Sequence, residues 1–156
     1  MLKKIISGGQ TGADRAGLDV AIKKGIPHGG WIPKGRKTED GTLPTKYNLS
    51  EMTSTSYPKR KEKNILDSDG TLIISHSKIT GGSSLTRKLA KQHEKPWIHL
   101  DMNTLSIKEA TEQLSRWIKG HDIQTLNVAG PRQSKDPDIH RKTSEVLEGC
   151  IENLMV

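Results

Sequence analysis

The chain of 156 residues contains no phenylalanine and only three tryptophans and two tyrosines. Proteins that bind single-stranded nucleic acid commonly stack bases on aromatic side chains, so this scarcity argues against such a platform. The single cysteine, Cys150, excludes an internal disulfide framework and a zinc site built from several cysteines. It lies in a predicted helix, where we expect it to pack in the core. A cytoplasmic protein is the simplest expectation.

Long hydrophobic runs are also missing from the sequence. No stretch reaches the roughly 18 apolar residues from which a membrane-spanning helix is recognised. The apolar part of the amino terminus is too short for a signal peptide. We therefore expect one domain, residues 1–156, with its own core and without a membrane segment.

Positive charge exceeds negative charge: 25 Lys and Arg against 18 Asp and Glu give a formal net charge of +7. Such an excess favours anionic partners, including phosphate, nucleotides, nucleic acid and metal oxyanions. Charge that only maintains solubility explains the excess equally well. The histidines lack the spacing of metal ligands, so we predict no metal site. His76, just after a predicted strand, is the one histidine of interest.

The chain is organised around a glycine-rich turn, Ser7–Arg15. A short apolar strand at 3–6 precedes it, and an amphipathic helix follows and ends near Gly25. Glycines let the backbone approach a ligand closely, and a helix start offers unpaired N–H groups. A tight turn without a ligand is the alternative. We predict a seat for phosphate or another oxyanion, formed by Gly8, Gly9, Gln10, Thr11 and Gly12.

The same arrangement of strand, small residues and helix occurs twice more. The strand at 71–75 is apolar on both faces, as in a central parallel strand, and a second helix begins at Leu85. Hydroxyls in this turn could bind phosphate or only cap the helix. The predicted ligand residues here are Ser75, Gly81, Gly82, Ser83, Ser84 and Thr86. A strand at 125–128 leads to the third set, Gly130, Pro131 and Arg132.

Arg132 can clamp an anion with paired N–H groups, or form a structural salt bridge instead. Residues 28–32 predict a short second strand, and 33–41 an exposed loop. Residues 42–58 predict an irregular segment with at most one helical turn, typical of a lid or binding loop. A short helix follows at 59–67. Basic residues of this region face the ligand or form a solvated charge run: Lys34, Arg36, Lys37, Lys59, Arg60 and Lys61.

Strands alternate with helices along the whole chain. A fourth strand at 97–100, a helix at 106–119 and a last helix from Asp136 complete the pattern. This alternation predicts an α/β fold with a mostly parallel, five-stranded sheet. Ligands in such folds bind beyond the carboxyl ends of the strands. We therefore expect the three small-residue turns to converge on one cleft.

The motifs at 7–19, 64–73, 80–86 and 127–132 resemble the circularly permuted YpsA-like branch of the SLOG superfamily. That branch is commonly labelled "putative molybdenum carrier". The resemblance runs from about residue 5 to the end of the chain. It implies a single-domain, Rossmann-like, three-layer α/β/α fold that recognises a nucleotide-derived ligand. It also implies that the last strand lies between the first and third, in the order second-first-fifth-third-fourth. Members of this family often associate, so we expect a homo-oligomer.

Two features depart from the relatives. The Lonely Guy phosphoribohydrolases of this superfamily carry a catalytic Glu after the second glycine turn, whereas residues 81–89 contain no acid. The family's Tyr…Arg-Thr stretch is matched by Tyr57 and Arg60, but Lys61 replaces the Thr. The missing acid therefore argues against inferring a hydrolytic activity for this chain from these relatives.

We predict a binding protein for a small anionic ligand, a phosphorylated nucleotide or cofactor. Molybdenum cofactor and molybdate are candidates through the resemblance alone. A hydrolase of nucleotide or ADP-ribose-type N-glycosides, using Asp14, is the first alternative. Asp14 could instead hold a ribose hydroxyl, an amino group or a cation, or stabilise the helix start. Nucleic-acid binding through the positive charge is the second alternative.

Overall fold

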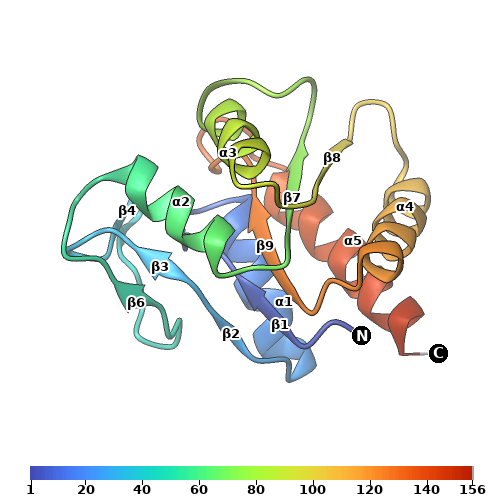
Figure 1. The fold of residues 1–156 in the computed structure, drawn as a ribbon, viewed down its shortest axis with the longest axis horizontal. Helices are drawn as coiled ribbons and strands as arrows, with labels where there is room; N and C mark the ends of the chain where they lie inside the picture. Colours follow the sequence, from blue (N-terminus) through green and yellow to red (C-terminus); the bar gives the residue numbers. More distant parts are fainter. Residues whose placement is uncertain (156) are drawn as a thin grey trace.

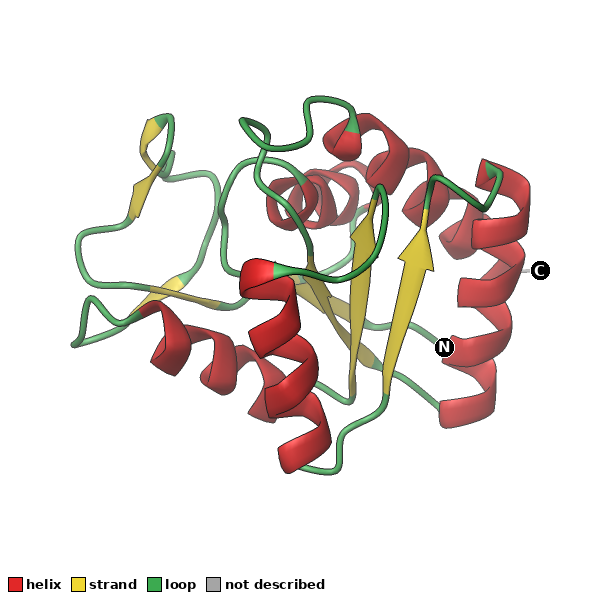
Figure 2. Cartoon of the chain, turned by 90° about the horizontal axis from the view of Figure 1, so that it is seen from above, coloured by secondary structure: helices red, strands yellow, loops and turns green. Residues whose placement is uncertain are grey.

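The fold is built on a five-stranded parallel sheet with helices on both faces (Figures 1 and 2). The computed structural model describes residues 1–155. The elements follow one another as β1 (Lys4–Ile6), α1 (Ala13–Lys24), β2 (His28–Gly29), β3 (Trp31–Ile32), β4 (Lys37–Thr38), β5 (Gly41–Thr42), β6 (Ser50–Glu51), α2 (Tyr57–Leu66), β7 (Gly70–Ser75), α3 (Gly81–Gln92), β8 (Trp97–Asp101), α4 (Ile107–His121), β9 (Thr125–Ala129) and α5 (Ile139–Leu154).

The helices form two layers. Helices α2 and α3 pack together on one side of the sheet, while α5 packs between α1 and α4 on the other. This is the predicted three-layer, Rossmann-like α/β/α architecture. No helix in the part of the chain that the structure describes is long and apolar enough to cross a membrane.

The strand order is β2-β1-β9-β7-β8, and every neighbouring pair is parallel. The predicted order is confirmed, with the last strand of the chain at the centre of the sheet. The register pairs Ile6 of β1 with Asn127, and Ile73 of β7 with Ala129. The carboxyl ends of β1, β9 and β7 therefore lie next to one another at one edge.

The main core lies between the sheet and the layer formed by α1, α4 and α5. All six residues of β7 are buried, as expected for a central strand covered on both faces. Cys150 packs in this core, which confirms its prediction. The largest fully buried side chains of the main core are Ile5, Leu72, Ile74, Leu100, Leu114, Ile118 and Ile123.

The predicted second strand at 28–32 is wrong as a single element. It divides at Gly30 into β2, which joins the main sheet, and β3, which pairs with β6 in a small separate sheet. Gly30 has a φ of +124°, and a Cβ there would lie 2.1 Å from the carbonyl oxygen of Ser7. The chain can therefore turn away so close to β1 only at a residue without a side chain.

The segment at 33–58 is more regular than the sequence predicts. It contains the antiparallel hairpin of β4 and β5 and the strand β6. Arg36 donates hydrogen bonds to several carbonyls of this segment, so the expectation that it could face a ligand is wrong. A second hydrophobic cluster fixes the segment to α1; its members are Leu18, Ile32, Leu43, Tyr47 and Leu49.

Three helix starts differ from their predicted positions. Helix α2 starts at Tyr57, because the Ser56 hydroxyl accepts a hydrogen bond from the Lys59 amide and caps it. Helix α3 starts at Gly81, so all predicted ligand residues of the second turn except Ser75 lie inside its first turns. Helix α5 starts only at Ile139.

Candidate functional site

Two of the three predicted turns interlock. The Ala13 amide donates to the Pro131 carbonyl oxygen at 3.2 Å, and the Gln133 amide donates to the Thr11 hydroxyl at 3.1 Å. A Cβ on Gly12 would lie 2.3 Å from the Pro131 carbonyl oxygen. The turns that follow β1 and β9 therefore pack backbone against backbone, which a larger residue at Gly12 would prevent.

The third turn lies at the same edge of the sheet but does not join this contact. A Cβ on Gly81 would meet no atom within 4 Å, and one on Gly82 would meet Nζ of Lys61 at 3.3 Å. The sequence therefore predicts the common edge correctly, but Gly81 and Gly82 are not packed against the other two turns as Gly12 is. On this side of the sheet, α3 packs against α2.

The helices that follow the three turns start without a side-chain cap. Helices α1, α3 and α5 have none, whereas Ser56 caps α2 and Ser106 caps α4. The capping role offered for Ser83, Ser84 and Thr86 is therefore wrong. The Thr86 hydroxyl donates to the Gly82 carbonyl oxygen at 3.1 Å. At α1 the amides of Ala13 and Arg15 already donate to the carbonyl oxygens of Pro131 and Gln10, whereas the start of α3 places the positive helix end at the sheet edge.

Arg60 lies directly over the first glycine turn. A Cβ on Gly8 would be only 1.9 Å from Nη1 of Arg60, so the guanidinium occupies the space that glycine leaves. Arg60 is 8% exposed, and its Nε has no hydrogen-bond partner within residues 1–155. The Asp14 carboxylate is 3.8 Å from Nη1, which is too long for a hydrogen bond. A buried guanidinium thus retains hydrogen-bonding capacity that the described chain does not use.

Asp14 and Lys61 complete a buried charged cluster with Arg60. Burial raises the pKa of Asp14, which is 5% exposed, although the charges of Arg60 and Lys61 and the Gln10 amide lower it. Burial lowers the pKa of Lys61 to about 8, Arg60 acts in the same direction, and Asp14 opposes them. Two cations therefore share one carboxyl group in a poorly solvated space, which favours an additional anion.

A small cavity of about 10 Å³ opens beside this cluster, between α2, α3 and β9. It has room for about one water molecule, so a larger ligand requires the surrounding side chains to move. Its lining consists of Arg60, Lys61, Asn64, Thr86, Asn127, Val128 and Ala129.

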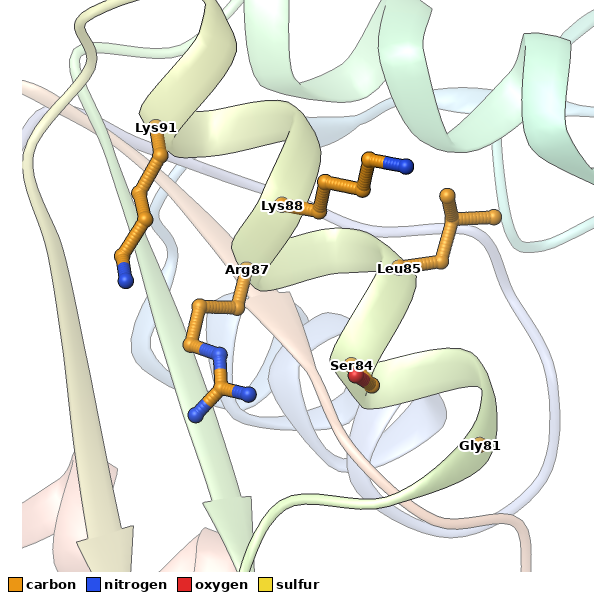
Figure 3. A pocket seen from close by; sticks show the side chains of 6 residues that line it. All are labelled: Gly81, Ser84, Leu85, Arg87, Lys88 and Lys91. Carbon is orange, nitrogen blue, oxygen red and sulfur yellow. The ribbon is translucent and has the colours of Figure 1, made fainter.

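A larger hollow of about 420 Å³ lies on α3, away from the buried cluster (Figure 3). Arg87 and Lys91 extend on one side of the helix, and Leu85 and Lys88 on the other. Only Gly81 and Ser84 connect this hollow with the predicted ligand residues. It is broad and open, and it lacks a convergent set of buried polar groups, so we place the candidate site at the Arg60 cluster instead.

Arg132 lies on the other side of the first glycine turn. Its side chain is 47% exposed, and its Nε lies 3.7 Å from a carboxylate oxygen of Glu39 at the tip of the β4–β5 hairpin. The Gln10 side-chain oxygen accepts from the amides of Thr11 at 3.1 Å and Glu39 at 2.9 Å. Sequence reasoning did not single out Glu39; the only available signal was an acid before Gly41 in a basic segment.

Ser75 and His76 are tied into the end of β7. The Ser75 hydroxyl donates to the Ser77 carbonyl oxygen at 2.9 Å and lies 2.8 Å from Nε2 of His99. His76 lies 2.7 Å from the Asp136 carboxylate through its Nδ1. These contacts join β7 to β8 and to the turn before α5, so Ser75 is not free to face the Arg60 cluster.

Comparison with known proteins places this geometry in context. The model of the circularly permutated YpsA SLOG family matches residues 5–151. A crystal structure of a protein named "putative molybdenum carrier protein", from Syntrophus aciditrophicus SB, is similar with a TM-score of 0.94 and 55% sequence identity. The match covers 96% of this chain and 95% of that one. No curated protein matches the chain.

Proposed function

The chain belongs to the circularly permutated YpsA SLOG family, and we propose that it binds the phosphate or oxyanion of a small nucleotide-like or cofactor ligand at Arg60. The observation that carries this proposal is the buried Arg60 guanidinium, whose Nε has no partner among the described residues. Burying an unpaired polar group costs free energy, and an anion would remove that cost. A guanidinium also matches the spacing of oxygens in a tetrahedral oxyanion.

The surroundings of Arg60 support the same ligand class. Lys61, which is half-buried, adds a second cation, and the uncapped start of α3 lies beside it at Gly82. All three groups lie at the carboxyl edge of a parallel sheet, where ligands of open α/β folds bind. In this proposal the anionic group binds between Arg60, Lys61 and the first turn of α3, and the rest of the ligand extends outward.

The name of the similar protein makes molybdate and molybdenum cofactor the first ligands to test. The donors around Arg60 fit such a group through hydrogen bonds to oxyanion or phosphate oxygens. Cys150 does not supply a thiolate there, because it is buried in α5 and burial raises its pKa to about 11. Within residues 1–155, no group of three or more His, Cys, Asp or Glu side chains could hold a metal ion. We therefore propose recognition of oxyanion or phosphate oxygens rather than of a bare metal.

Arg60→Met is expected to weaken binding of molybdate and adenosine monophosphate by about 10- to 100-fold, the worth of one or two charge-assisted hydrogen bonds. Isothermal titration calorimetry measures the change. Arg116→Met, at an exposed position of α4, removes the same charge and should bind like the wild type. Native mass spectrometry of the purified protein would identify a ligand that it retains.

Gly8→Ala tests the same site without removing any charge. The new methyl group would overlap the Arg60 guanidinium and displace it. We expect a loss of affinity similar to that of Arg60→Met, while the thermal unfolding transition remains cooperative. Wild-type affinity in both variants would show that the anion does not bind at Arg60.

Asp14 provides the observation for a second candidate function. Burial raises the pKa of its carboxyl group, so it retains a proton more readily and could assist a leaving base as a general acid. Incubation with adenosine monophosphate or NAD⁺ should then release free base in the wild type but not in Asp14→Asn. Intact ligand after incubation with the wild type favours the binding protein.

A further inference from the structure

We propose that the Glu39 carboxylate occupies a second anion subsite, formed by Thr11, Ser134 and Arg132, from which a ligand with two anionic groups displaces it. The sequence places Glu39 and Asp40 at the tip of the β4–β5 hairpin, directly before Gly41. This extends the proposed function, on which it rests, from one anionic group of the ligand to two.

Donors from both interlocked turns converge on the Glu39 carboxylate. Ser134 donates twice, through its amide at 3.0 Å and its hydroxyl at 2.6 Å, and the Thr11 hydroxyl donates to the same carboxylate. Arg132 lies 3.7 Å away. Hydroxyls, an amide and a guanidinium around one anion are the groups that proteins use to bind phosphate. These donors also hold the pKa of Glu39 below its usual range, so the group that they hold is an anion.

The hairpin that carries Glu39 is a small element outside the main sheet. Its two strands contain two residues each, and Gly41 and Thr42 are exposed. Two-stranded hairpins of this size have little stability of their own. Besides the contacts of the Glu39 carboxylate, the tip is held by the ion pair of Asp40 with Arg15, at 2.7 Å, by Arg15 on the Thr38 hydroxyl and by the Glu39 amide on Gln10. Leu43, directly after β5, belongs to the second hydrophobic cluster, which can remain packed when the tip of the hairpin shifts.

The two subsites flank the same glycine turn. Arg60 covers Gly8, and Glu39 is held at Thr11, three residues further along. Three residues span at most about 11 Å even when fully extended. A ligand that reaches both subsites therefore carries two anionic groups on separate parts of the molecule, up to about this distance apart. When Glu39 is displaced, Thr11, Ser134 and Arg132 can bind the second anionic group of the ligand instead.

Titration with inorganic phosphate, followed by calorimetry, tests this proposal. In Glu39→Ala we expect a second equivalent of phosphate to bind, at least tenfold more tightly than any second equivalent in the wild type. Glu39→Gln keeps the side-chain shape and should show the same change to a smaller extent. It replaces Glu39→Ala in this test if that variant folds poorly. Glu112→Ala removes an exposed carboxylate on α4 and should behave as the wild type.

Two further variants separate this proposal from the proposed function. Adding Arg132→Ala to Glu39→Ala should abolish the second equivalent, whereas adding Arg60→Met should abolish only the first. If the Arg60 site binds no anion but Glu39→Ala gains one that depends on Arg132, the proposed function fails and the second subsite stands. If Glu39→Ala and Glu39→Gln both keep the stoichiometry and affinity of the wild type, Glu39 is only a structural clamp and the proposal is overturned.

Discussion

Gly130→Ala is expected to lower the free energy of unfolding by about 3 kcal/mol or more, the upper range for forcing extra atoms into a packed interior. The added Cβ would lie 2.3 Å from the Ile74 carbonyl oxygen and 2.7 Å from Cβ of Ala13. The first of these atoms belongs to the backbone of β7, so it cannot move aside without disturbing the centre of the sheet. Chemical denaturation measures the loss.

Gly120→Ala provides the matched control for this prediction. Gly120 lies in the last turn of α4, and a Cβ there would meet no atom within 4 Å. The substitution should leave stability unchanged or raise it by up to about 1 kcal/mol, because alanine favours the helix over glycine. Equal effects at the two positions would contradict the close packing of β7, β9 and α1 at Gly130. They would also contradict the close approach of the strand ends that form the candidate site.

Lys61→Met is expected to raise the free energy of unfolding by up to about 3 kcal/mol at pH 7, an effect that disappears at high pH. The folded-state pKa of Lys61 is about 8, against 10.5 in the unfolded chain. Between these values the unfolded state binds more protons, so wild-type stability rises with pH. Below pH 8 the folded protein bears the cost of a poorly solvated charge, which methionine does not carry.

The measurement is chemical denaturation of both proteins at pH 7, 9 and 10.5. The difference in stability should be largest at pH 7 and close to zero at pH 10.5. Lys59→Met, at an exposed position of the same helix, should show no such dependence. A constant difference across this range would show that Lys61 is solvated and is not part of a buried cationic site.

The two substitutions are expected to change stability in opposite directions. Gly130 permits the packing that brings the strand ends together, so replacing it should destabilise the protein. Lys61 and Arg60 place charge where the described chain does not fully compensate it, so replacing Lys61 should stabilise the protein. Residues that reduce stability without a structural role are typical of binding and catalytic sites. A variant that is more stable and binds anions less well would link this cost to ligand recognition.

The sequence predicted the elements whose signals are local. The strand at 71–75 follows from a continuous apolar run, and the first helix follows from its period and from Gly25 at its end. The sheet order came from the family resemblance rather than from periodicity. Arg60 was also taken from the family motif, without any indication of its burial. Predictions failed where local signals were ambiguous, as in the division of 28–32 at Gly30 and the small strands of 33–58.

By itself, then, the sequence determined the alternation of strands and helices and the glycine turns at the strand ends, because these depend on neighbouring residues. Only the tertiary structure decided that Arg60 is buried over Gly8 with an unused donor, that Lys61 loses its solvation, and that Glu39 is held by Ser134. Each of these facts joins residues far apart in the chain, Glu39 and Ser134 being 95 positions apart. The reason is physical: burial and hydrogen-bond pairing are properties of surroundings that form only when distant segments pack together.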